Sequence, residues 1–278
     1  MKSTKKQDTI IDRKGRKVPI CSWIPVRTLC QIVVVHGFSE HMVYYQTMAK
    51  VLSEQGIAIH MMDLPGHGMA GGRRGHIDAF EEYLDNLDQL FSGNPFFLKS
   101  KFTFLLGHSL GGLVAAHYCL SRVHVLKGLI LSSPLIGFSF FDTIKVLPLA
   151  RYLARNHRNE PLPKPAGVKS LSRNPDQWEV YYSDPCRGRL ISPNLYLEVN
   201  AMSRKLQQAA SAVTLPLLMF VASKDSVVSP EAAQSFFSRV NSDDKSLVIF
   251  TEAMHELFQE QESGQILEII QSWIRQRI

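Results

Sequence analysis

The sequence predicts an α/β fold with a mostly parallel central sheet, helices on both faces of that sheet and an inserted helical segment. Short apolar runs typical of strands alternate with segments of helical periodicity over most of the 278 residues. A serine flanked by glycines stands between one such strand and the helix that follows it. A proline-rich stretch interrupts the alternation once, over residues 134–212. Alternating strands and helices favour a parallel sheet that is covered on both sides.

The expected elements follow in chain order. Residues 9–24 predict a β-hairpin, because apolar pairs flank a turn-rich link at residues 12–16. Later apolar runs predict strands over residues 31–35, 57–62, 102–106, 129–133, 217–221 and 247–250. Periodic apolar residues predict helices over residues 44–55, 80–91, 110–116, 230–240 and 264–275.

The central motif is Gly107-x-Ser109-x-Gly111, which is typical of a sharp turn from a strand into a helix. Glycines are expected on either side of the serine because a Cβ there would strike the neighbouring strand or helix. Such a turn exposes the Ser109 hydroxyl at the positive end of a helix. It also directs the backbone N–H of Leu110 toward a site where negative charge would develop. The motif therefore predicts that Ser109 is a nucleophile.

A serine hydroxyl needs a base to remove its proton, and that base is usually a histidine oriented by a carboxylate. Of ten histidines, only His255 lies beyond the last predicted strand. Asp225 directly follows the strand at residues 217–221, which suits a carboxylate held at the same edge of the sheet. The order serine, acid, histidine is the one expected in this arrangement. We therefore predict a triad of Ser109, Asp225 and His255.

Three other acidic residues compete with Asp225 for this role. Asp243 and Asp244 precede a strand, so we expect them at the opposite edge of the sheet. Glu252 is too near His255 in sequence to support its ring easily.

An oxyanion hole requires two N–H donors, and we assign them to Phe38 and Leu110. Phe38 lies in the loop after the strand at residues 31–35, and Leu110 follows Ser109. Nearby histidines at positions 36, 41 and 67 are expected to be structural, bonded to backbone within their own loops.

Composition limits the other functions. The chain is 45% hydrophobic and 20% charged, and no apolar run approaches the ~18 residues of a membrane span. Its four cysteines lack metal-ligand spacing, so we expect reduced cysteines in a cytoplasmic protein with no metal and no cofactor. The net charge is +6, with a basic cluster between residues 2 and 17. We expect that cluster to be a solvated, partly frayed terminus rather than a contact for nucleic acid or anionic lipid.

The proline-rich stretch predicts a helical cap over the carboxyl ends of the strands, where ligands of α/β sheets bind. The expected domains are a core of residues 1–133 and 213–278 and a cap of residues 134–212. Apolar cap residues would line a tunnel for a substrate chain or touch a membrane surface, although they would equally pack the cap on the core. These residues are Leu135, Ile136, Phe138, Phe140, Phe141, Ile144 and Leu147.

These motifs together resemble the monoacylglycerol lipase and lysophospholipase branch of the α/β-hydrolases. The resemblance is carried by residues 35–41, 63–68 and 107–112 and by the segments around Asp225 and His255. It covers residue 31 to the C-terminus, and it implies the same triad and oxyanion donors. Two features depart from the family pattern. Phe38 often has a smaller residue in its place, and the loop at residues 69–75 is rich in glycine and arginine, including Arg73 and Arg74. We expect that loop to be solvated rather than bound to a lipid phosphate.

The leading hypothesis is a serine hydrolase acting on a single-chain lipid ester, either a monoacylglycerol or a lysophospholipid. Because fold does not fix substrate, a short-chain carboxylesterase, a thioesterase and a peptidase stay open as alternatives. A catalytically silent binding protein of the same fold is the non-enzyme alternative, and its usual sign would be a missing triad residue. The sequence does not fix the head group, the acyl length or the oligomeric state.

Overall fold

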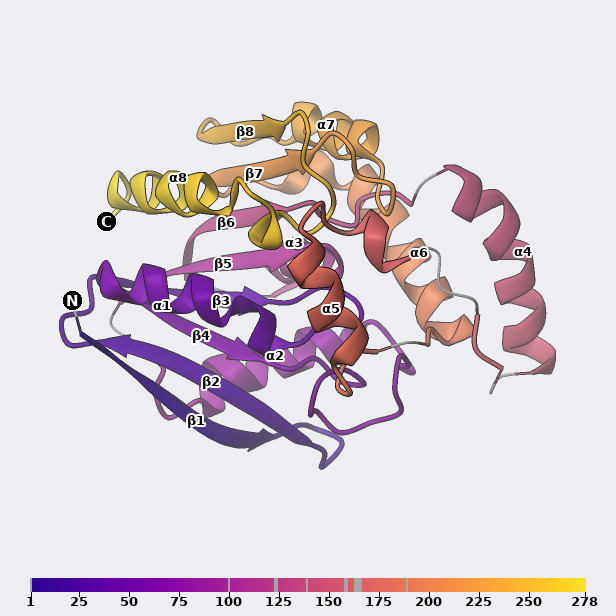
Figure 1. Cartoon of the computed structure of the whole chain (residues 1–278), viewed down its shortest axis with the longest axis horizontal. Coiled ribbons are helices and arrows are strands. Elements are labelled where there is room, and N and C mark those ends of the chain that lie inside the picture. Colours follow the sequence, from indigo (N-terminus) through magenta and orange to yellow (C-terminus); the bar gives the residue numbers. More distant parts are fainter. Residues whose placement is uncertain are drawn as a thin grey trace.

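An eight-stranded sheet forms the centre of this computed structural model (Figure 1). The structure describes residues 2–99, 101–122, 125–138, 140–157, 160–162, 167–188 and 190–278, with the side chains of residues 140–145 outside that description. The strand order is β1-β2-β4-β3-β5-β6-β7-β8. The strands are β1 (Ser3–Ile11), β2 (Lys17–Pro25), β3 (Cys30–Val35), β4 (Ile57–Met62), β5 (Phe102–His108), β6 (Leu126–Ser132), β7 (Leu217–Ala222) and β8 (Lys245–Phe250). β1 and β2 pair antiparallel, as do β2 and β4, and the remaining pairs are parallel.

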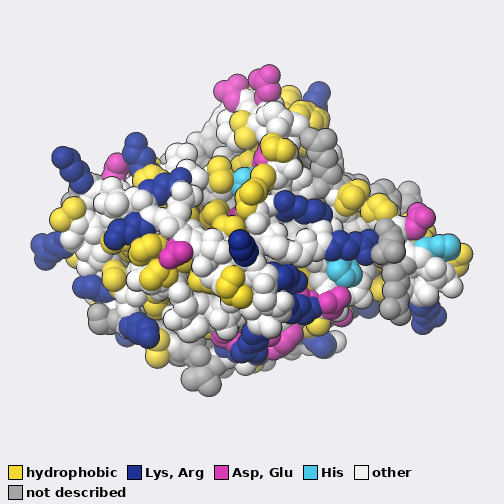
Figure 2. Space-filling model, turned by 90° about the horizontal axis from the view of Figure 1, so that it is seen from below, with side chains coloured by type: hydrophobic (Ala, Val, Ile, Leu, Met, Phe, Trp, Pro, Cys, Tyr) yellow, Lys and Arg dark blue, Asp and Glu magenta, His cyan; other side chains and the backbone are white. Residues whose placement is uncertain are grey.

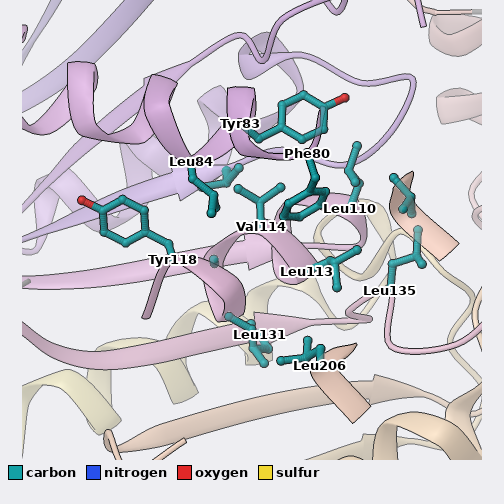
Figure 3. Close-up of a cluster of buried hydrophobic side chains, with 14 of the residues drawn as sticks. Phe80, Tyr83, Leu84, Leu110, Leu113, Val114, Tyr118, Leu131, Leu135 and Leu206 are labelled. Carbon is teal, nitrogen blue, oxygen red and sulfur yellow. The ribbon is translucent and has the colours of Figure 1, made fainter. Parts of the chain in front are cut away.

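Helices cover both faces of the sheet, and the alternation of strand side chains explains why. In β3, Ile32 and Val34 enter the core beneath α1 and α8, whereas Val33 and Val35 enter the core shared with α2, α3 and α7. These helices are α1 (Gln46–Glu54), α2 (Glu81–Gly93), α3 (Leu110–Ser121), α7 (Pro230–Arg239) and α8 (Ser263–Arg275). Figure 3 shows part of the second core, which contains Leu84 of α2, Leu113 and Val114 of α3 and Leu131 of β6. The α/β architecture and the expected strands and helices are therefore confirmed.

Between β6 and β7 the chain leaves the sheet and forms three helices. They are α4 (Phe140–Asn156), α5 (Pro175–Ser183) and α6 (Pro193–Gln208). Short 3₁₀ helices occur at Met42–Tyr45, Val168–Ser170, Ala210–Ala212 and Leu257–Gln259. In Figure 1 the arrowheads of the parallel strands point toward α4 and α6, so these helices lie beyond the carboxyl ends of the strands.

The N-terminal segment differs from the expectation of a frayed end. Strand β1 begins at Ser3 and is paired with β2 along its whole length. The basic turn that follows it is neutralised by acidic residues of or near α2, with Arg13 2.7 Å from Asp85 and Arg16 2.8 Å from Glu82. On the face shown in Figure 2, lysine and arginine side chains are spread widely, with acidic side chains between them. The prediction of a frayed terminus was wrong because strand pairing and these ion pairs order it.

No helix in the described part of the chain combines the length and the apolar character needed to cross a bilayer.

A buried polar network lies within the sheet around His60 of β4. The His60 ring is fully buried, with Nδ1 2.8 Å from Ser22 Oγ and Nε2 3.1 Å from Gln31 Oε1. Asn94 Nδ2 also lies 3.2 Å from Nδ1. Burial lowers the pKa of His60 to about 4, so the folded protein holds this ring neutral.

This network predicts that part of the stability is lost in acid. Below its ordinary pKa, His60 is protonated in the unfolded chain and neutral in the folded chain, so the free energy of unfolding falls as the pH drops toward 4. A His60→Gln variant lacks this contribution. The stability difference between wild type and variant should therefore shrink by about 2 kcal/mol between pH 7 and pH 5. Urea denaturation at both pH values measures it, and a difference that stays constant with pH would contradict the burial effect.

Candidate active site

Ser109 stands at the turn between β5 and α3 in a strained backbone conformation, with φ 53° and ψ −117°. Such a conformation costs on the order of 1–3 kcal/mol and persists only where the surroundings impose it. Here, the Ser109 N–H donates to the Ser132 carbonyl at 3.0 Å. The Ser109 carbonyl accepts N–H groups of Leu113 and Leu135 at 3.2 and 3.0 Å. The turn is thus tied to β6, to its own helix and to the segment that leaves β6.

The two glycines of the motif allow this close packing, as the sequence predicts. A Cβ on Gly107 would lie 2.2 Å from the Gly111 carbonyl oxygen. A Cβ on Gly111 would lie 2.1 Å from the carbonyl oxygen of Val35, on the neighbouring strand β3. Both distances are far below van der Waals contact, so only glycine fits at these positions.

His255 and Asp225 meet Ser109 in one chain of hydrogen bonds. His255 Nε2 lies 2.9 Å from Ser109 Oγ, and His255 Nδ1 lies 2.7 Å from Asp225 Oδ2. The other carboxylate oxygen, Oδ1, accepts the N–H groups of Val227 and Val228 at 2.8 and 3.0 Å, which fixes its orientation. This geometry identifies Nδ1 as the protonated ring nitrogen and leaves Nε2 free to accept the serine proton.

The electrostatics of His255 suit a base. Burial disfavours the charged ring, but the adjacent Asp225 carboxylate outweighs burial and raises the pKa of His255 above its ordinary value. The side chains of both residues are almost completely buried, so their interaction is only weakly screened by water.

The rival acids lie elsewhere. The Asp244 backbone carbonyl accepts the Leu217 N–H at the start of β7, and its carboxylate pairs with Arg277, so it lies at the opposite edge of the sheet. Asp243 and Glu252 are exposed on the surface.

Phe38 and Leu110 border the cavity in front of Ser109. Leu110 is the first residue of α3, where backbone N–H groups have no partner within the helix. In the part of the chain that the structure describes, neither N–H donates to a protein acceptor. Both donors therefore stay available to a ligand oxygen.

The loop histidines differ in their partners. His36 and His67 lie against the backbone oxygens of Gly37 and Pro65, as expected for structural residues, and burial lowers the pKa of each to about 3. His41 departs from the expectation. Its Nε2 lies 2.7 Å from Asp184 Oδ2, so it ties its loop to the region after α5 rather than to local backbone.

A largely apolar cavity opens onto Ser109. Of the residues predicted to bind substrate, Leu135 and Phe138 line it. Ile136 is buried in the core and Leu147 packs against that core, and neither is among the described residues that line the cavity. The structure therefore brings Leu135 and Phe138, but not Ile136 and Leu147, to the cavity wall, and a role of any of them in substrate binding stays a prediction. The side chains of residues 140, 141 and 144 lie outside the described residues.

Later parts of the inserted segment also contribute to the cavity wall, and the sequence did not predict this contribution. This contribution consists of Leu171, Arg187, Ile191, Leu195, Tyr196 and Val199. Leu195 and Val199 are one helical turn apart on α6, and this spacing was the available signal.

A polar cluster also lines the cavity, and the sequence did not predict it. Glu40, His108 and Glu256 are buried, and their candidate metal-ligand atoms lie within 4.8 Å of one another. Two buried carboxyl groups this close hold a proton between them, and the Arg187 guanidinium in the same cavity wall adds a positive charge. A bound cation would have to displace the shared proton and face that charge, so the cluster fits a proton-sharing pair better than a metal centre.

Comparison with known proteins agrees with this geometry. A family model described as serine aminopeptidase, S33 matches residues 28–262. The chain belongs to this hydrolase family.

Relatives and solved structures extend the likeness over nearly the whole chain. Phospholipase YtpA of Bacillus subtilis is 30% identical over 262 residues, covering 92% of this chain and 99% of its own. Human monoglyceride lipase is 30% identical over 287 residues, covering 96% and 90% of the two chains. The crystal structure of Paleococcus ferrophilus monoacylglycerol lipase matches with a TM-score of 0.84 and 26% identity, covering all of both chains. The chain therefore belongs to the α/β-hydrolase superfamily and lies in its monoacylglycerol lipase branch, which its motifs resemble.

The close packing around Ser109 predicts that adding one methyl group at Gly111 strongly lowers the stability of the fold. Gly111→Ala should lower the free energy of unfolding by about 3 kcal/mol or more, since its Cβ would overlap the β3 backbone. Gly264→Ala is the matched control because a Cβ in that position of α8 meets nothing within 4 Å. The control should gain about 0.5–1 kcal/mol from helix propensity. Thermal and urea denaturation compare the two, and equal stabilities would contradict the packing.

Proposed function

We propose that this protein is a serine hydrolase that cleaves the carboxylic ester of a single-chain lipid. The observation that carries the proposal is the hydrogen-bonded chain from Asp225 through His255 to Ser109 at an apolar cavity. The names of two relatives, a phospholipase and a monoglyceride lipase, support this substrate class. No cofactor takes part in the proposed reaction.

The proposed reaction has two halves. Ser109 Oγ attacks the ester carbonyl while His255 Nε2 takes the hydroxyl proton, and Asp225 stabilises the imidazolium. The negative oxygen of the tetrahedral intermediate accepts hydrogen bonds from the Phe38 and Leu110 N–H groups. His255 then gives its proton to the leaving alcohol. A water molecule activated by His255 cleaves the acyl-enzyme in the same manner and releases the fatty acid.

We propose that residues 134–212 form a cap domain on a core of residues 1–133 and 213–278. The cap contributes apolar walls to the cavity through Leu135, Phe138 and α6, which suits an acyl chain. Contacts across the boundary hold it in place. Arg173 pairs with Glu260 at 2.5 Å, and Asp184 accepts from the His41 ring at 2.7 Å.

The cap also carries exposed apolar side chains, among them Leu149 and Tyr152 on α4 and Tyr182 on α5. In a lipid hydrolase such side chains suit contact with the surface that supplies the substrate. We propose a cytoplasmic enzyme that meets membranes peripherally through this cap.

The first test of the function is release of free fatty acid from a monoacylglycerol and from a lysophosphatidylcholine of equal chain length. Ester cleavage should be detected with at least one of them, and Ser109→Ala should abolish it because no nucleophile is left. Release from the glyceride alone identifies a monoacylglycerol lipase. Preference for the phospholipid identifies a lysophospholipase and gives the arginines at positions 73 and 74 a role.

Asp225→Asn provides a graded control. The amide oxygen can still accept from Val227 and Val228, but the loss of charge should reduce the rate about 10³–10⁴-fold. Release from neither lipid, together with cleavage of short esters, thioesters or peptides, would replace the lipid proposal. Failure of a fluorophosphonate to label Ser109 in the folded protein would favour a silent binding protein.

A further inference from the structure

Two further acidic residues, Glu40 and Glu256, lie beside the proposed triad and take no part in the proposed reaction. Glu40 follows β3, and Glu256 follows His255 in the chain; they are 1% and 5% exposed. One carboxylate oxygen of each residue and a His108 ring nitrogen lie within 4.8 Å of one another. Two buried carboxyl groups this close cannot both ionise readily, so the pair holds one proton and a single negative charge.

The surroundings decide which of the two keeps the proton. Burial and the adjacent Glu256 raise the pKa of Glu40 well above its ordinary value, despite hydrogen bonds that its Oε2 accepts from the Gly37 N–H and the Tyr45 hydroxyl at 2.7 Å each. For Glu256, burial is outweighed by its contacts with His108 and Glu40, which hold its pKa below the ordinary value. The proton therefore resides on Glu40, and the charge on Glu256.

That charge lies close to the catalytic imidazole. Glu256 Oε2 is 3.4 Å from His108 Nε2, and the His108 and His255 rings are 5.0 Å apart between centroids. The Glu256 N–H donates to the Leu171 carbonyl at 2.8 Å, which fixes the backbone of this residue against the inserted segment. Glu256 therefore has a defined place beside His255, separate from that of Asp225.

The other charged and titratable groups facing His255 and Glu256 can be named. Asp225 lies on the Nδ1 side of the ring, and Arg187 opposes both acids with a positive charge. Among the described residues, Tyr45 and Tyr181 also lie beside the two acids, and burial raises the pKa of each, so both stay neutral. Glu256 thus offsets the effect of Arg187 on the imidazole.

We propose that Glu256 is a positioning residue whose carboxylate, buried beside the protonated Glu40 and the His108 ring, stabilises the imidazolium that forms on His255 when Ser109 attacks. The inference rests on the proposed function. It assigns Glu256 no contact with the reacting atoms, because its effect passes through His255.

The test is the pH dependence of Ser109 reactivity, measured from pH 4.5 to 9 with a fluorophosphonate and with p-nitrophenyl acetate. In Glu256→Gln the imidazolium loses a stabilising charge, so the pKa of His255 falls and the acid limb moves to lower pH. His255 is then also a weaker base, and the plateau rate should fall about three- to tenfold. The double variant Glu40→Gln/Glu256→Gln should show the same shift, since it prevents the charge from moving to Glu40.

Glu40→Gln alone is the matched variant. Its amide mimics a protonated carboxyl, donating to Glu256 and accepting from Tyr45 and Gly37, so the midpoint of its acid limb should stay at the wild-type pH. Arg187→Gln removes a positive charge that disfavours protonation of His255, so the acid limb of this variant should move to higher pH. This variant also keeps the proposal testable if Glu256→Gln does not fold, as judged by circular dichroism.

Three outcomes would overturn the inference. These are a wild-type midpoint in the double variant, a shift in Glu40→Gln equal to that in Glu256→Gln, and an unchanged midpoint in Arg187→Gln. Failure of the proposed function gives different results: a silent binding protein would react with neither probe at any pH, whereas a hydrolase of another substrate class would react with the probes but release no fatty acid from either lipid.

Discussion

The constraint on which the site depends is the strained backbone at Ser109. A residue at φ 53° and ψ −117° would relax if it were free, but hydrogen bonds to β6, α3 and the start of the inserted segment oppose this. The carbonyl oxygen of Val35 approaches so closely that residue 111 must be glycine. The sheet order contributes to this arrangement, because β3 and β6 flank β5 and so bring the loop that contains Phe38 and the segment that contains Leu135 to either side of the serine.

The remaining parts of the site follow from the carboxyl ends of two further strands. Asp225 comes after β7 and His255 after β8, and the backbone N–H of Lys224 donates to the Ala253 carbonyl at 3.1 Å between these loops. The inserted segment then covers the site from the side and ties itself to it through Asp184 and Arg173. The hydrogen-bonded chain from Asp225 to Ser109 is therefore built at the strand ends, whereas the cavity wall is shared with the inserted segment, which part-buried polar contacts join to the rest of the chain.

This division explains what could be predicted from the sequence. Strands, helices and triad candidates follow from local pattern and chain order, because each of the three candidate residues lies in the turn or loop that follows a strand. The cavity wall could be predicted only in part. Leu135 and Phe138 lie near β6, whereas Ile136 turns into the core and α6 approaches from about 60 residues away. The pairing of His41 with Asp184 and of Glu40 with Glu256 depends on contacts between segments 143 and 216 positions apart, for which no local pattern exists.

The most direct test of the account is to trap the acyl-enzyme. The protein is mixed with a monoacylglycerol, quenched in acid within the first turnovers and digested, and the peptides are analysed by mass spectrometry. An acyl-enzyme on Ser109 predicts that the mass of the fatty acyl group is added to the peptide containing Ser109, and that the adduct is absent from Ser109→Ala. An acyl group on another residue, or turnover of the lipid by protein that lacks the Ser109 hydroxyl, would contradict it.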